Sequence, residues 1–184
     1  MSKTSAMSAF VIGCALFLFP LPLAAQASKT DTLFQSHFAA LAGGEPCYAR
    51  AYSSEHLKAH PEQRVSEIEL DMAKENPDGI PITEDAIELG FGIRLKGKPR
   101  WYTNVALCKS EGTRISCFLE GDGGAFTLTA AGDGLRLVTG DYGIAIEGAE
   151  EFVELSGAQG DDRVFILQPA DKAVCARSSE DLKE

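Results

Sequence analysis

Basic side chains are scarce in this sequence. It has 17 lysines and arginines against 27 aspartates and glutamates, which gives a formal net charge of −10 at neutral pH. A surface with this charge repels nucleic acids and anionic membranes, and it attracts basic proteins or cations. The composition therefore disfavours nucleic-acid binding and indicates either a basic partner or a requirement for solubility alone.

Histidine is also rare, and the common catalytic motifs are missing. A Ser-His-Asp triad would have to use His37, His56 or His60, and no Gly-x-Ser-x-Gly motif is present. Glu55 precedes His56 instead of following it, so the pair does not form the zinc motif His-Glu-x-x-His. Pro61 disfavours helical geometry at His60, so the two imidazoles need not lie on one face. We predict no catalytic residue, no metal and no cofactor; a metal-assisted hydrolase using the three histidines is the least favoured alternative.

The first 27 residues have the three-part layout of a secretory signal peptide. One lysine precedes an apolar run over residues 9–25, and Ala25-Gln26-Ala27 has the small-x-small pattern of a cleavage site. The run is shorter than the ~20 residues of a membrane-spanning helix, and two prolines interrupt it. We expect cleavage after Ala27. The mature chain would have 157 residues (184 − 27), a charge of −11 (16 basic against 27 acidic residues), no membrane span and a periplasmic or secreted location.

Four cysteines follow the predicted signal peptide, and none is part of a Cys-x-x-Cys pair. This spacing disfavours a zinc site or a redox-active pair, whereas an even number in an exported chain predicts disulfides. If Gly112-Thr113 is a two-residue type II′ turn, Cys108 faces Cys117 at a non-hydrogen-bonded position, with Cα atoms about 4.5 Å apart. Cys47 and Cys175 then pair with each other and join the two ends of the mature domain.

Alternating apolar residues dominate the mature sequence and predict β-strands. The clearest run covers residues 86–97, where every second residue from Ile87 to Leu95 is apolar. We expect Trp101, Thr103, Val105 and Leu107 to continue this apolar face on the next strand. Further strands are predicted at residues 47–52, 68–72, 125–130, 135–140, 142–148, 152–157 and 163–169. Eight or more short strands indicate a mainly β fold, an antiparallel meander that closes into a small barrel or forms a two-sheet sandwich.

Short helices and a flexible end complete the predicted domain. Phe34, Phe38 and Leu41 recur at helical spacing and predict a short N-terminal helix. Residues 53–61 predict a single helical turn with a serine cap, ended by a proline. We expect one β-rich domain over residues 28–176, followed by a flexible charged tail over residues 177–184.

A cluster of basic residues stands out in the acidic chain. Arg94, Lys96, Lys98 and Arg100 lie within seven residues, next to Trp101. Alternation places the first two on the face opposite the apolar row. Such a patch could bind the anionic group of a glycan, a lipid or a peptide carboxylate. The competing interpretation is a solvated face that protects a hydrophobic strand from edge pairing.

The sequence features together favour a non-catalytic binding module of the cell envelope. Its acidic surface would be offered to a basic envelope protein, such as a lysozyme or another hydrolase. The first alternative is a β-barrel that binds an anionic envelope ligand through the Arg94–Arg100 cluster and Trp101. The second is the metal-assisted hydrolase.

Overall fold

The computed structural model describes residues 32–39, 45–73, 75–147, 152–155 and 160–181. The predicted signal peptide and Leu41 lie outside these ranges. The described residues form three helices, α1 (Leu33–His37), α2 (Ser54–Ala59) and α3 (Lys172–Asp181). They also form nine strands, β1 (Cys47–Ala51), β2 (Val65–Asp71), β3 (Ile87–Leu95), β4 (Trp101–Glu111), β5 (Arg114–Leu119), β6 (Gly124–Ala131), β7 (Gly134–Glu147), β8 (Phe152–Leu155) and β9 (Val164–Pro169).

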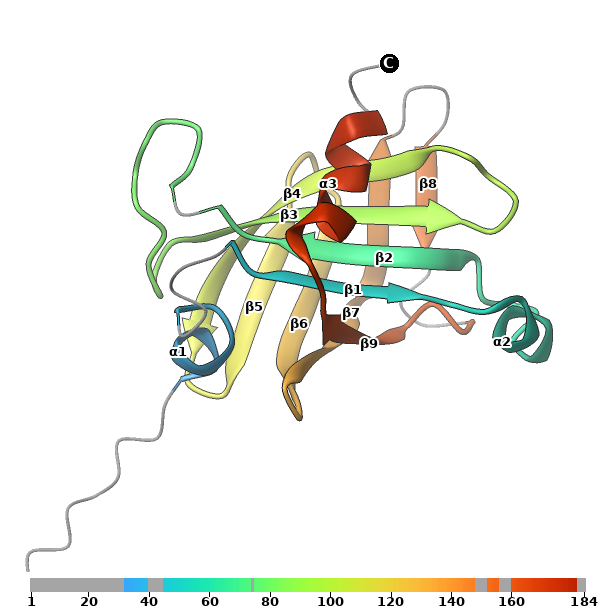
Figure 1. Cartoon of the computed structure of the whole chain (residues 1–184), viewed down its shortest axis with the longest axis horizontal. Helices are drawn as coiled ribbons and strands as arrows, with labels where there is room; N and C mark the ends of the chain where they lie inside the picture. The colour runs from blue at the N-terminus through green and yellow to red at the C-terminus, as the bar shows by residue number, and fades with distance from the viewer. Residues whose placement is uncertain (1–31, 40–44, 74, 148–151, 156–159, 182–184) are drawn as a thin grey trace, which may run out of the picture.

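Eight of the strands form a closed antiparallel barrel. Strands β1 to β7 pair consecutively, and β9 pairs with both β1 and β7, which closes the sheet. Strand β8 is an addition that pairs with the second half of β7. Figure 1 shows the strands wrapped around a common interior. The mainly β prediction is confirmed, and the barrel replaces the sandwich alternative.

Strand β7 is longer than the sequence pattern indicated. Two strands were expected at residues 135–140 and 142–148, but a single strand runs from Gly134 to Glu147. Its first half pairs with β6 and β9, and its second half, Ile144–Glu147, pairs with β8. The two halves are joined by an irregular segment at residues 140–143, where Gly143 has φ +77° and the pairing with β6 shifts.

The barrel interior is packed with apolar side chains. Every second residue of β3 from Ile87 to Leu95 is buried, as predicted. The expected continuation on β4 is wrong, because Tyr102 is buried whereas Leu107 is 50% exposed. The register explains the error: Trp101 pairs with Arg94 on the outer face, so Trp101, Thr103, Val105 and Leu107 share the outer side of the sheet. Tyr102, Ala106 and Cys108 point inward instead.

Both predicted disulfides are present. The β4–β5 hairpin has the predicted register, with Glu111 opposite Arg114 and Cys108 opposite Cys117 at a Cα separation of 4.1 Å. Gly112 has φ +68°, and Thr113 is not among the residues with positive φ, as a type II′ turn requires. The second bridge joins Cys47 to Cys175 with Cα atoms 5.9 Å apart.

The helices lie at the periphery of the barrel. In α1, Leu33 and Phe34 are buried in the core, and α1 and α2 lie at opposite ends of the barrel (Figure 1). Helix α2 begins after the predicted cap, where Ser53 Oγ accepts a hydrogen bond from the His56 N–H (3.1 Å), and it ends before Pro61. No described helix is both long enough and apolar enough to span a bilayer.

The first five residues of the predicted flexible tail lie in a helix. Residues 177–181 form the second half of α3, which lies on the outer face of β1 to β4. Ser178 is buried against the barrel, and its N–H donates to Glu69 Oε1 (3.1 Å). Tertiary contacts therefore order a segment that has little apolar character of its own.

Candidate functional site

The predicted basic cluster is divided among different contacts. Arg94 forms an ion pair with Glu67, and its guanidinium carbon lies 5.7 Å from the centre of the Trp101 ring. Lys96 Nζ donates instead to the carbonyl of Pro61 (3.2 Å). Lys98 and Arg100 are exposed in the β3–β4 turn. The charge of Arg94 is thus balanced inside the protein, which weakens its attraction for an external anion.

A trough on the outer face of β2 and β3 holds helix α3. The outward side chains of β2 are Glu67, Glu69 and Asp71, and their neighbours on β3 are Arg94, Gly92 and Gly90. A Cβ atom at Gly92 would lie only 3.0 Å from the Ser178 Cβ, and one at Gly90 would collide with the Asp71 carboxylate. Gly92 therefore provides the space that lets the helix approach the sheet, and Gly90 provides the space for the Asp71 side chain.

Buried carboxylates line this trough. Glu69 is 1% exposed, and its Oε2 has no hydrogen-bond partner among the described residues. Burial raises the pKa of Glu69 to about 7, although the Ser178 hydrogen bonds and the Arg177 charge act in the opposite direction. Burial also raises the pKa of Asp71. Arg177 Nη1 lies 2.9 Å from Glu67 Oε2, and Arg177 Nη2 lies 3.9 Å from Glu69 Oε2.

The three histidines do not form one site. His37 is buried in α1, where its Nε2 lies 3.2 Å from the carbonyl oxygen of Gly132. At the opposite end of the barrel, His56 and His60 stack with ring centres 4.3 Å apart. The two rings therefore share a face, which the sequence had not indicated. The described residues contain no group of three or more His, Cys, Asp or Glu side chains arranged to hold a metal.

A strip of exposed apolar side chains crosses the outer face of the barrel. Its members are Ile80 (57% exposed), Leu107 (50%), Phe118 (65%) and Tyr142 (95%), and we call them the apolar strip. Leu107 and Phe118 are direct cross-strand neighbours on β4 and β5. Ile80 is held beside them by a turn at residues 76–79, in which Asn76 Oδ1 accepts hydrogen bonds from the N–H groups of Asp78 and Ile80.

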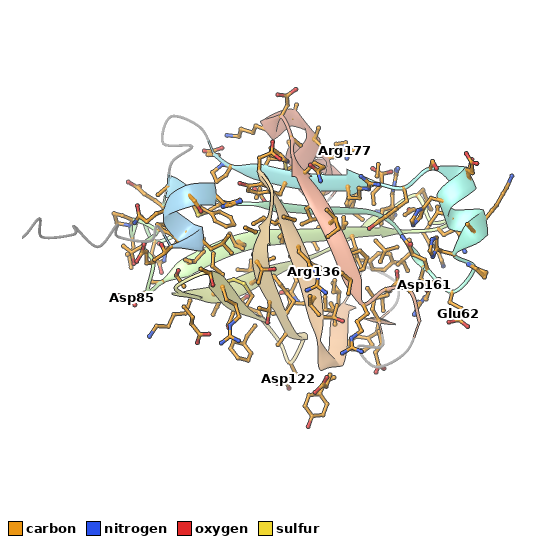
Figure 2. The ribbon with its side chains drawn as sticks, turned by 90° about the horizontal axis from the view of Figure 1, so that it is seen from below. Glu62, Asp85, Asp122, Arg136, Asp161 and Arg177 are labelled. Atoms are coloured by element: carbon orange, nitrogen blue, oxygen red, sulfur yellow. A yellow bond between two sulfur atoms is a disulfide. The ribbon has the colours of Figure 1, made fainter. Side chains whose placement is uncertain are left out.

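Two hollows lie along the apolar strip. The first, of about 500 Å³, is lined by Ile80, Leu107 and Phe118 together with the loop that precedes β3. The second, of about 440 Å³, lies between Phe118 and Tyr142. Four carboxylate residues also line these hollows, Asp85, Glu88, Glu111 and Asp122, against a single basic residue, Lys109. The border of this apolar surface carries more acidic than basic groups, although Glu111 is paired with Arg114 and Lys109 Nζ lies 4.0 Å from Asp85 Oδ1. Figure 2 labels Asp85 and Asp122, which line the first and the second hollow, respectively.

Sequence analysis did not find either the trough or the apolar strip. For the trough, a signal existed: the acids of β2 alternate with Ile68 and Leu70, and Gly90 and Gly92 alternate with the apolar row of β3. For the strip, the predicted hairpin register already placed Leu107 opposite Phe118, but Leu107 was assigned to the buried face, and nothing in the sequence joined Ile80 and Tyr142 to this pair.

The chain matches no protein-family model, no curated protein and no solved structure. Its function therefore has to be inferred from its own residues.

Proposed function

We propose that this protein is an exported, non-catalytic binding module that holds a basic protein of the cell envelope against the apolar strip. The observation that carries the proposal is the set of four large exposed side chains bordered by carboxylates. Export is supported by the two disulfides, since such bonds persist in oxidising compartments.

The exposed aromatic residues are the expected anchors of an interface. Contiguous apolar surface is uncommon on soluble proteins that have no partner, and aromatic side chains contribute much of the energy of protein interfaces. Phe118 borders both hollows, which places it at the centre of the strip. An incoming side chain could fill either hollow while the strip loses its contact with water.

The charge of the border favours a basic partner over a second copy of this chain. In a symmetric dimer the same patch would face itself, so that the carboxylates of Glu88 and Asp122 would meet like charges, whereas Glu111 is already paired with Arg114. A basic protein would bring compensating lysines and arginines. The net charge of −10 acts in the same direction at longer range.

The two alternatives have less support. An anionic ligand would have to compete with Glu67 for Arg94, the innermost residue of the predicted basic cluster. A hydrolase that uses all three histidines is disfavoured because His37 lies at the opposite end of the barrel from His56 and His60 (Figure 1).

The test is a binding titration of the disulfide-bonded protein with basic envelope hydrolases, beginning with a lysozyme. We expect binding at low salt that weakens at 0.1 M salt and above, where the screening length is about 10 Å. Phe118→Ala/Tyr142→Ala should weaken binding by about thirtyfold, the effect of losing an anchor worth about 2 kcal/mol. Phe152→Ala is the matched control, since Phe152 is 64% exposed and lines neither hollow. The proposal fails if no basic hydrolase binds at low salt or if the double variant binds as tightly as the control.

A further inference from the structure

A row of three side chains on the outer face is joined by an arginine from helix α3. Glu67, Arg94 and Trp101 are cross-strand neighbours on β2, β3 and β4. Arg177 reaches this row from α3, with Nη1 2.9 Å from Glu67 Oε2 and its guanidinium carbon 5.5 Å from the centre of the Trp101 ring. Figure 2 shows Arg177 on α3, away from Asp85 and Asp122 at the apolar strip.

We propose that Glu67, Glu69 and Trp101 form a binding site for an arginine side chain of a partner protein, and that Arg177 occupies this site in the free protein. This inference does not rest on the proposed function, because none of its residues belongs to the apolar strip. A partner arginine binds by displacing the side chain of Arg177, while helix α3 stays in place.

The chemistry of the site suits a guanidinium better than an ammonium group. A planar guanidinium can lie against an aromatic ring and donate to carboxylates along its edge, whereas an ammonium is a compact and strongly hydrated charge. The Trp101 ring and the Glu67 carboxylate already make both kinds of contact with Arg177. The buried Glu69 Oε2, which lacks a hydrogen-bond partner in the described part of the chain, offers a further acceptor.

The side chain of Arg177 can leave without unfolding the helix. It is 43% exposed, and ion pairs that are open to solvent contribute little stability. Helix α3 is held independently by the Cys47–Cys175 disulfide and by the hydrogen bond from the Ser178 N–H to Glu69. Arg94 stays paired with Glu67, so the carboxylate left without a cation is that of Glu69. Because Arg177 is part of the same chain, it competes at a high effective concentration, and the site of the free protein is largely filled.

The experiment uses the single tryptophan of the chain, Trp101, as a fluorescent reporter. The full disulfide-bonded protein and its Arg177→Ala variant are titrated with N-acetyl-arginine methylamide. The lysine analogue carries a compact ammonium group in place of the planar guanidinium, and the citrulline analogue is uncharged. Arg50→Ala is the matched control variant, since Arg50 lies 5.4 Å from the ring of Tyr52 on another part of the barrel.

Removal of Arg177 should tighten arginine binding by at least about tenfold relative to the wild type. The lysine probe should bind less tightly than the arginine probe, and the citrulline probe should give no saturable change. Arg50→Ala should behave as the wild type does. Adding Glu69→Gln to the Arg177 variant should weaken arginine binding again.

Equal binding of the arginine and lysine probes would overturn the proposal, as would unchanged arginine affinity after removal of Arg177. If Arg177→Ala does not fold, as judged by circular dichroism, Arg177→Gln takes its place. The wild type supplies an independent test. When it is titrated up to saturation, its Kd for the arginine probe must be lower than its Kd for the lysine probe, and equal Kd values would also overturn the proposal.

Discussion

The two disulfides should contribute unequally to stability, because they close loops of very different length. The Cys47–Cys175 bridge spans 128 residues and the Cys108–Cys117 bridge spans 9. In the chain-entropy model, loops of these lengths stabilise the folded state by about 5 and about 2.5 kcal/mol, respectively. A domain of this size has a total stability of about 5–15 kcal/mol, so loss of the longer bridge should bring the protein close to unfolding.

The perturbation is the paired replacement Cys47→Ala/Cys175→Ala, compared with Cys108→Ala/Cys117→Ala. All four cysteines are buried, so both double variants lose similar packing. The difference between their free energies of unfolding therefore reports the effect of loop length. Urea unfolding should show a free energy of unfolding lower by about 2 kcal/mol or more in the first variant than in the second. Equal losses, or a larger loss from the hairpin bridge, would refute the loop-length reasoning.

Three further predictions concern the trough and helix α2. Burial raises the pKa of Glu69 to about 7 from 4.5, so the folded state holds a proton that the unfolded state has released, and stability should fall as pH rises between these values. The free energy of unfolding, measured with urea at pH 5 and at pH 8, should fall by up to about 3 kcal/mol less in Glu69→Gln than in the wild type. An equal fall in both proteins would contradict the assignment. Gly92→Ala should lower the melting temperature through a loss of about 1–3 kcal/mol, because the new Cβ would crowd the Ser178 Cβ; an unchanged melting temperature would show that α3 is not closely packed there. Ser53→Ala should cost about 1 kcal/mol in urea unfolding by removing the cap of α2, and no loss would mean that the cap hydrogen bond is not formed in solution.

The parts of the fold that were predictable from sequence depend on local patterns. The buried face of β3 follows from strict alternation, and the register of the β4–β5 hairpin follows from a two-residue turn centred on Gly112. Once that register is known, the pairing of Cys108 with Cys117 follows from geometry, and the second disulfide follows by elimination. Each of these steps uses residues close to one another in the chain.

The failures arise where long-range contacts decide the structure. Strand β4 has apolar residues on both faces, so the pairing of Arg94 with Trp101, and not alternation, determines which face is buried. Helix α3 has no apolar stripe, and it is ordered by a disulfide and by polar contacts with β2. In the apolar strip, Leu107 and Phe118 face each other across the β4–β5 hairpin, but Ile80 and Tyr142 come from a loop and from β7 and lie beside them only in the folded sheet.

Hydrogen exchange on the complex with a basic protein tests the central claim most directly, because it maps the contact surface without any substitution. The account predicts slower exchange on binding in residues 76–88, 105–109, 116–125 and 140–143, which carry the apolar strip and most of its acidic border. It predicts no change in α2 or in the β3–β4 turn that carries Lys98 and Arg100. Protection confined to α2 and that turn, with none along the strip, would contradict the account.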